Sequence, residues 1–160
     1  MDELKFAVIG NPVSHSLSPD IHLFFASQFQ LERYTYNKIK SNENDFERDI
    51  NDFFKNGGMG LNVTVPFKGL AYNLCDELDQ SAGLCKSVNT VLIDSGKLIG
   101  HSTDGQGLID DFLHKEITLE DSKILIIGAG GSAASIISSL LFHGKIKEIS
   151  ILNRTKSNAL

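Results

Sequence analysis

One stretch near the C-terminal end restricts the possible folds more than any other. Residues 124–137 read ILIIGAGGSAASII, an apolar run followed by a glycine turn and then by small and apolar residues. We therefore expect a strand over Lys123–Ile127, a turn over Gly128–Gly131 and a helix over Ala133–Phe142. A second strand is expected at Glu148–Leu152, and strands that alternate with helices indicate an α/β fold.

The glycine turn has the spacing G-x-G-G-x-A, which is typical of dinucleotide-binding sites when a strand precedes it and a helix follows. Gly128 permits the tight turn, and Gly130 lets the backbone approach a pyrophosphate at the N-terminus of the helix. Ala133 stands at the position of the third glycine, where the motif accepts alanine. The residues expected to contact the coenzyme are Gly128, Ala129, Gly130, Gly131 and Ser132.

The residues after the second strand indicate which coenzyme is bound. An NAD site usually has Asp or Glu there, about 20 residues beyond the glycines, to accept a hydrogen bond from the ribose 2′-hydroxyl. This chain has Asn153, Arg154 and Thr155 instead. A guanidinium can bind a 2′-phosphate through two hydrogen bonds, whereas a carboxylate would repel it. The sequence therefore favours NADP, with the alternative that Arg154 is only a solvated surface residue.

Strands and helices also alternate in the part of the chain before residue 115. Strands are expected at Lys5–Gly10, Tyr34–Ile39, Leu61–Val65, Val88–Asp94 and Lys97–Gly100, the last two as a hairpin. Helices are expected from Ser18, from about Asn42 to Gly57, after Lys68, near Ser81–Cys85 and over Gly107–His114. Ser18 should cap the first helix, whose apolar stripe is Ile21, Phe24, Phe25 and Phe29. In the strand LNVTV, the alternation predicts that Leu61, Val63 and Val65 share one face.

Composition excludes several classes of partner. The 160 residues carry 15 Lys and Arg against 20 Asp and Glu, a net charge of −5, so we expect no nucleic-acid or membrane partner. No apolar run approaches the length needed to span a membrane, and the N-terminus does not read as a signal peptide. Cys75 and Cys85 lack metal-site spacing, so we expect no metal and reduced thiols in a cytoplasmic protein.

Four polar segments lie where a strand is expected to end or a helix to begin. They are Ser14–Ser18, Asn62–Lys68, Ser87–Thr90 and Ser102–Gly105. Open α/β sheets bind ligands at such junctions, and hydroxyls, amides, one lysine and one carboxylate suit a small polyhydroxylated acid. Simpler interpretations remain open at this point: Ser18 and Asp104 as helix caps, and Lys68 as a solvated lysine. Thr64 has the corresponding simple interpretation of a strand residue.

Taken together, these segments closely resemble the shikimate dehydrogenase family. That family carries G-N-P-x-x-H-S-x-S-P, N-V-T-V-P-x-K, V-N-T, N-T-D-G, G-A-G-G and N-R-T in this order. The corresponding segments here are GNPVSHSLSP (Gly10–Pro19), NVTVPFK (Asn62–Lys68), VNT (Val88–Thr90), STDG (Ser102–Gly105), GAGG (Gly128–Gly131) and NRT (Asn153–Thr155). The match therefore extends over most of the chain in the same order.

The resemblance implies a reversible, NADP-linked reduction of 3-dehydroshikimate to shikimate in aromatic amino-acid biosynthesis. It implies that Ser16 and Ser18 hold the substrate carboxylate, that Thr64 and Asn89 bind ring hydroxyls, and that Lys68 and Asp104 flank the reacting C–O group with Lys68 as the acid/base. General chemistry agrees, since hydride addition to a ketone leaves an alkoxide that an ammonium group can stabilise and protonate.

The implied fold class is α/β, with an N-terminal substrate-binding α/β domain followed by the first part of a Rossmann-type NADP-binding domain. The expected boundaries are residues 1–104 for the first domain, 105–115 for a connecting helix and 116–160 for the second. A complete doubly wound domain has about six strands, and only two fit after residue 122. We therefore expect an N-terminal fragment that is not competent alone. Its end near Leu160 leaves an apolar sheet edge, so a homodimer is also open.

The chain departs from the family pattern at three positions. Ser102 stands where the family usually has Asn, Ala134 stands where many members have a basic residue after the glycine turn, and Asn158 stands where a second arginine often follows N-R-T. The NADP preference therefore depends mainly on Arg154. Two alternatives stay open: a quinate/shikimate dehydrogenase with broader substrate or coenzyme use, and a binding relative without catalytic activity.

Overall fold

Strands and helices alternate throughout the computed structural model, which describes residues 3–155 and 157. In chain order the elements are β1 (Leu4–Gly10), α1 (Ser18–Gln28), β2 (Tyr34–Lys40), α2 (Phe46–Lys55), β3 (Gly58–Val63), α3 (Lys68–Leu74), β4 (Glu77–Leu78), α4 (Gln80–Cys85), β5 (Thr90–Asp94), β6 (Lys97–His101), α5 (Asp104–His114), β7 (Lys123–Ile127), α6 (Gly131–His143) and β8 (Glu148–Leu152). The expected α/β class is confirmed, and β4 is a short strand that the sequence did not predict.

The first six strands form one mixed sheet in the order β2-β1-β3-β5-β6-β4. β1 is parallel to both β2 and β3, whereas β5 is antiparallel to β3 and to β6. The carboxyl ends of β1, β3 and β6 therefore lie at one edge of the sheet together with the start of β5. This topology gathers at one edge the four polar segments that the sequence keeps far apart.

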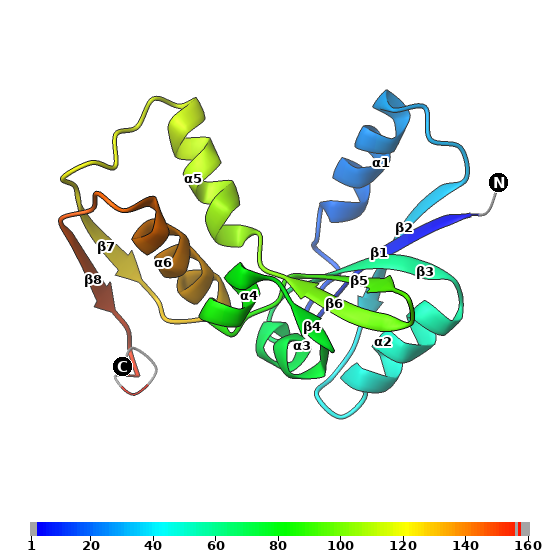
Figure 1. The fold of residues 1–160 in the computed structure, drawn as a ribbon. Coiled ribbons are helices and arrows are strands. Elements are labelled where there is room, and N and C mark those ends of the chain that lie inside the picture. Colours follow the sequence, from blue (N-terminus) through cyan, green and yellow to red (C-terminus); the bar gives the residue numbers. More distant parts are fainter. Residues whose placement is uncertain (1–2, 156, 158–160) are drawn as a thin grey trace.

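Helices cover both faces of this sheet, with α1 on one side and α2 and α3 on the other (Figure 1). Successive residues of β1 point to opposite faces, so Ile9 packs with Ile50 and Phe67 while Val8 packs with Tyr36. The core on the α2 and α3 side is the larger one. It therefore supports the start of α3, where Lys68 lies.

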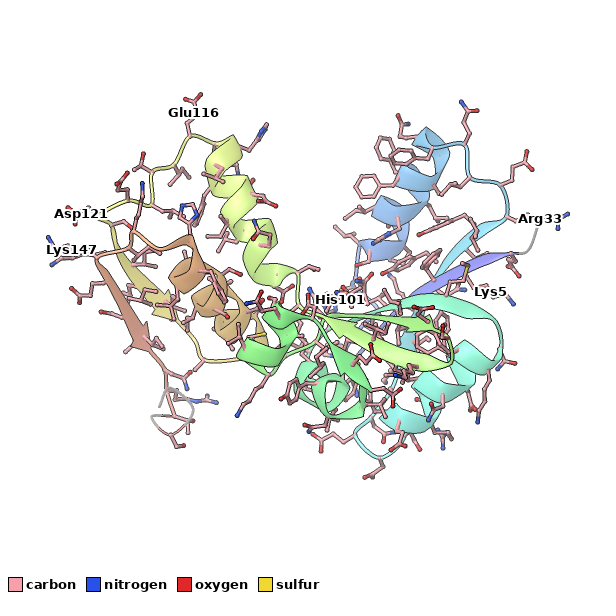
Figure 2. The ribbon with its side chains drawn as sticks, viewed as in Figure 1. Lys5, Arg33, His101, Glu116, Asp121 and Lys147 are labelled. Carbon is pink, nitrogen blue, oxygen red and sulfur yellow. The ribbon has the colours of Figure 1, made fainter. Side chains whose placement is uncertain are left out.

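The second part of the chain is built around the parallel pair β7 and β8, joined by α6. α5 belongs to the same core, because Ile109 packs there with Leu119 and Leu140. β6 leads directly into α5, and Figure 2 shows His101 at this junction. The expected domain boundaries at residues 104 and 115 stay a prediction. Within residues 3–155 and 157, no helix is long and apolar enough to cross a membrane.

The start of α1 differs from the sequence-based expectation. Ser18 does not cap the helix: it is the first helical residue, and the capping position belongs to Leu17, which makes no side-chain capping bond. The start of the helix is instead supported by the side chain of Ser16, whose Oγ accepts a hydrogen bond from the Ser18 N–H at 3.2 Å. Proline at the next position fits this register, because its missing N–H has no partner in the first turn.

The apolar stripe that the sequence predicts on the first helix lies on an exposed face of α1. Exposed fractions are 47% for Ile21, 60% for Phe24, 50% for Phe25 and 75% for Phe29. Only Ala26 of this helix is buried. The spacing of these side chains correctly indicated a helix, but nothing in the described residues covers its outer face.

The strand in LNVTVPFK begins and ends earlier than expected. β3 covers Gly58–Val63, and Val65 is 57% exposed although Leu61 and Val63 are buried. The alternation breaks because the chain turns after Thr64, whose carbonyl accepts a hydrogen bond from the Phe67 N–H at 3.0 Å. Phe67 enters the core in place of Val65.

Two remaining expectations concern the thiols and the sheet edge. Cys75 and Cys85 are both free, as predicted, and burial raises the pKa of the Cys75 thiol to about 11, with a smaller contribution from Asp76.

Leu160, where an apolar edge was expected, lies outside the described residues. On the described strands Leu125, Ile127 and Leu152 are exposed.

Candidate active site

An ion pair between Lys68 and Asp104 forms the centre of the candidate site. Lys68 is the first residue of α3, just after the turn that follows β3, and Asp104 is the first residue of α5, just after β6. The Lys68 Nζ donates to Asp104 Oδ2, and the two side chains are only 12% and 25% exposed. Partial burial limits competition from water, so the ammonium and carboxylate keep each other oriented.

Asn89 fixes the other oxygen of this carboxylate. Its Nδ2 donates to Asp104 Oδ1 at 2.6 Å and to Thr103 Oγ1 at 3.0 Å, while its Oδ1 accepts from the Thr103 N–H at 3.1 Å. Asn89 itself is held in place because its carbonyl accepts from the Val63 N–H at the end of β3. The amide therefore orients Asp104 and connects the two polar segments that flank β5 and β6.

These contacts determine the charge of Asp104. Burial by itself raises the pKa of this carboxyl, but the hydrogen bond and positive charge of Lys68 lower it, as do hydrogen bonds from Asn89 and Ser132. The net result is a pKa below the ordinary value for an aspartate. Asp104 is therefore a carboxylate at neutral pH.

The structure places Ser16, Ser18 and Thr64 at the same sheet edge as the ion pair. Ser16 Oγ donates to Ser18 Oγ at 3.1 Å, and both side chains are half-buried beyond the end of β1. Thr64 follows β3, where its N–H donates to the Ile9 carbonyl at 2.9 Å. Its methyl group lies so close to Gly10 that a Cβ there would approach within 2.3 Å, so any side chain at residue 10 would displace Thr64.

Asn62 and Tyr36 belong to this edge, although sequence reasoning assigned them no role in the site. Tyr36 Oη donates to Asn62 Oδ1 at 2.7 Å, and Asn62 Nδ2 donates to Thr90 Oγ1 at 3.2 Å. Burial raises the pKa of Tyr36 to about 12, so its hydroxyl stays a donor. The alternation that pairs Asn62 with Thr64 was a usable signal for Asn62, whereas nothing local in the sequence indicated Tyr36.

The glycine turn has the geometry of a phosphate-binding loop. Gly128 has a φ of +115°, which favours glycine, and its N–H donates to the Leu152 carbonyl at 2.8 Å. A Cβ built at Gly128 or at Gly130 would meet nothing within 4 Å, so the turn leaves open space at both residues. No side-chain capping bond occupies the start of α6, where helix N–H groups favour an anion, and the turn therefore fits a coenzyme pyrophosphate.

The NRT segment lies beside this turn because β7 and β8 are parallel, with Ile127 opposite Leu152. Asn153 Nδ2 donates to the Thr155 carbonyl at 2.7 Å, which closes the turn after β8. Arg154 is exposed. A guanidinium at this position fits a 2′-phosphate.

Residues 3–155 and 157 contain no cluster of His, Cys, Asp and Glu side chains that could hold a metal ion.

The two parts of the site touch each other through α6. Ser132, in the first turn of α6, accepts from Lys68 Nζ at 2.8 Å and donates to Asp104 Oδ2 at 3.0 Å. Deeper in the interface, Ser102 Oγ donates to Ser135 Oγ at 2.8 Å, and both residues are buried. The serine that replaces the family's asparagine at position 102 thus bonds across the interface to α6.

The fold and these contacts define a class: a two-part α/β protein with a dinucleotide-binding βαβ unit next to a polar sheet edge. Comparison with known families identifies "Shikimate dehydrogenase substrate binding domain" over residues 8–91 and "Shikimate / quinate 5-dehydrogenase" over residues 111–160. The chain belongs to the shikimate dehydrogenase family.

Similar proteins cover nearly the whole chain. Shikimate dehydrogenase (NADP(+)) of Acinetobacter baylyi is 43% identical over 155 residues, which are 97% of this chain and 58% of that protein. The crystal structure of shikimate dehydrogenase from Aquifex aeolicus is 31% identical with a TM-score of 0.90, covering 98% of this chain and 58% of that one. Shikimate 5-dehydrogenase from Thermus thermophilus, in complex with NADP(H) and shikimate, is 31% identical with a TM-score of 0.88 over 98% of this chain and 58% of its own. The chain thus spans somewhat more than half the length of these relatives.

Proposed function

We propose that the protein containing this chain is an NADP-dependent shikimate dehydrogenase, which reduces 3-dehydroshikimate reversibly to shikimate. The observation that carries the proposal is the half-buried pair of Lys68 and Asp104, which lies between the polar sheet edge and the glycine turn. The relatives named shikimate dehydrogenase (NADP(+)) support the substrate and the coenzyme. Two free thiols agree with the cytoplasmic location that belongs to this proposal.

In the proposed mechanism Lys68 acts on the reacting oxygen. The residues of the glycine turn would hold the coenzyme, which would supply a hydride as NADPH in reduction and accept one as NADP+ in oxidation. During reduction the C=O double bond becomes a single bond, and the alkoxide takes a proton from the Lys68 Nζ. During oxidation the lysine takes that proton back. Asp104 keeps the ammonium oriented and stabilises its charge through the bond to Oδ2.

The remaining candidate residues hold the substrate in this proposal. Ser16 and Ser18 bind the carboxylate, since paired hydroxyls beyond the end of β1 can donate to its two oxygens. Thr64 and Asn89 bind ring hydroxyls. Phosphate contacts come from the turn between Gly128 and Ser132, and Asn153, Arg154 and Thr155 hold the ribose phosphate. The proposal also includes domain boundaries at residues 104 and 115. It includes, in addition, the association of two copies of the protein as a homodimer.

The proposal is tested by binding of shikimate to the 160-residue chain. In an NMR titration we expect weak binding that shifts the amide signals of Ser16, Thr64, Lys68 and Asn89. Quinate is titrated in parallel, and tighter binding of quinate would favour the broader dehydrogenase. Shifts confined to other parts of the molecule, or none with either compound at millimolar concentration, would contradict the assigned substrate site. Fast oxidation of shikimate by this chain alone would disprove the expectation that it cannot hold NADP productively.

Arg154→Asp should lower affinity for NADP by roughly 10- to 100-fold, which corresponds to the loss of a hydrogen bond between charged groups. Affinity for NAD should change much less, because the new carboxylate can accept from a free 2′-hydroxyl. Coenzyme dissociation constants are measured for a protein that contains this chain and binds NADP. The control is Lys145→Asp, which makes the same charge change at an exposed lysine before β8, beside Glu120. Equal losses in both variants would show that Arg154 does not read the 2′-phosphate.

A further inference from the structure

Ser132 makes two hydrogen bonds that a coenzyme-binding turn does not require. Its hydroxyl accepts from Lys68 Nζ at 2.8 Å and donates to Asp104 Oδ2 at 3.0 Å. Lys68 lies 64 residues earlier in the chain and Asp104 lies 28 residues earlier, so both contacts depend on how α6 packs against the first part of the chain. Lys68 Nζ also donates to the same Asp104 oxygen, so the side chains of Lys68, Asp104 and Ser132 are all hydrogen-bonded to one another.

Close packing fixes the backbone that carries this hydroxyl. A Cβ at Gly131 would lie 2.7 Å from Ser87 Oγ and 3.3 Å from Lys68 Cβ, so α6 approaches Lys68 as closely as a glycine allows. One turn further along α6, the buried Ser135 Oγ accepts from the Gly105 N–H at 3.0 Å. A Cβ at Gly105 would lie 2.3 Å from the Ser135 carbonyl oxygen. The start of α6 is therefore held on both sides, and packing fixes the backbone position from which the exposed Ser132 side chain reaches Lys68 and Asp104.

We propose that Ser132 is a positioning residue for the acid/base pair, holding Lys68 and Asp104 in register from the coenzyme-binding part of the protein. This inference rests on the proposed roles of Lys68 and Asp104. An ammonium group has three N–H donors. Asp104 takes one and Ser132 takes a second, and the two bonds together set the direction of the third, which is left for the oxygen of the substrate.

The Ser132 hydroxyl also makes the orientation of Lys68 and Asp104 depend on the distance between α3 and α6. Moving α6 away from α3 breaks both bonds of Ser132 at once and leaves Lys68 tethered through Asp104 alone. The side chains of Lys68 and Asp104 are thus fully oriented only when the glycine turn is close to them. Ser132 in this way links the position of the proposed coenzyme site to the geometry of the reacting group.

The test compares Ser132→Ala with Ser132→Thr, which keeps a hydroxyl, in the 160-residue chain. The control is Ser138→Ala in the same helix, since Ser138 is partly exposed and lies two turns beyond the contact. The Asp104 carboxyl is titrated by carbon-detected NMR. We expect Ser132→Ala to raise the pKa of Asp104 towards its ordinary value, because one donor to the carboxylate is lost. Ser132→Thr and Ser138→Ala should titrate like the original chain.

A second readout separates this inference from the proposed function. In an active protein containing the chain, Ser132→Ala should lower kcat at least roughly tenfold, because the hydrogen bonds of Ser132 to Lys68 and to Asp104 are both lost, with little change in KM for shikimate. Ser132→Thr should restore most of the rate. An unchanged Asp104 titration in Ser132→Ala would overturn the positioning role whatever the substrate is. A raised pKa in a protein that does not turn over shikimate would keep the Ser132 contact and overturn only the proposed function.

Discussion

Lys68→Ala should lower turnover of shikimate by about two orders of magnitude or more, as expected for the loss of a general acid/base. The measurement is kcat with shikimate and NADP in an active protein that contains these residues. Substrate affinity should fall much less, because the residues proposed to bind the carboxylate and the ring, namely Ser16, Ser18, Thr64 and Asn89, are unchanged. Without the ammonium, the Asp104 carboxylate is left half-buried beside Asn89 and Ser132, so the pKa of Asp104 should also rise.

The matched control for this experiment is Lys97→Ala. Lys97 also forms an ion pair, with Glu77 at 2.6 Å, but its side chain is 60% exposed and lies at the far end of the hairpin from the site. We expect the control variant to keep its turnover and nearly all of its stability, since exposed ion pairs contribute little. Near-normal turnover in Lys68→Ala would remove this lysine from the mechanism and would favour a binding relative without catalytic activity.

Phe67→Ala should destabilise the protein by about 3–5 kcal/mol, the usual cost of removing a buried aromatic side chain. Phe67 is 1% exposed, and its ring packs against Phe46 with centroids 4.9 Å apart. It immediately precedes Lys68, and its N–H bonds the Thr64 carbonyl in the turn that begins α3. The cavity therefore opens directly beneath the proposed catalytic lysine, and loss of activity should accompany the loss of stability.

The free energy of unfolding of Phe67→Ala is measured by urea denaturation monitored with circular dichroism. Phe24→Ala is the control, because Phe24 is 60% exposed on α1 and its replacement removes a ring of the same size. Its free energy of unfolding should change by no more than about 0.5 kcal/mol, as is usual for surface positions. If the two variants lost equal stability, the turn between β3 and α3 would not depend on the core beneath it.

Much of the site could be predicted from the sequence because strand ends carry readable signals. The polar segments around Lys68 and Asp104 follow apolar runs, and the alternating order of elements brings such ends to one sheet edge. The glycine turn and its flanking strands were also placed correctly. These features depend on local pattern together with a topology that few α/β arrangements satisfy. The roles of the site residues themselves remain predictions.

Other features depended on packing that a sequence pattern does not encode. The spacing of Ile21, Phe24 and Phe29 indicated an apolar helix face, but a pattern cannot show what covers that face, and in the described residues it is exposed. Ser18 looked like a cap because serine, proline and aspartate follow in order, yet the helix begins one residue earlier than that register requires. The contact of Ser132 with Lys68 depends on how two separate sheets dock, which no local signal records.

The bond between Ser102 and Ser135 has a consequence for how related chains diverge. Each hydroxyl is buried and faces the other at 2.8 Å, so neither side chain can grow without displacing its neighbour. An ancestor that carried the larger amide at position 102 would need glycine or alanine at position 135 to make room for it. We expect these two positions to have changed together during evolution, as a compensating pair that joins the two parts of the chain.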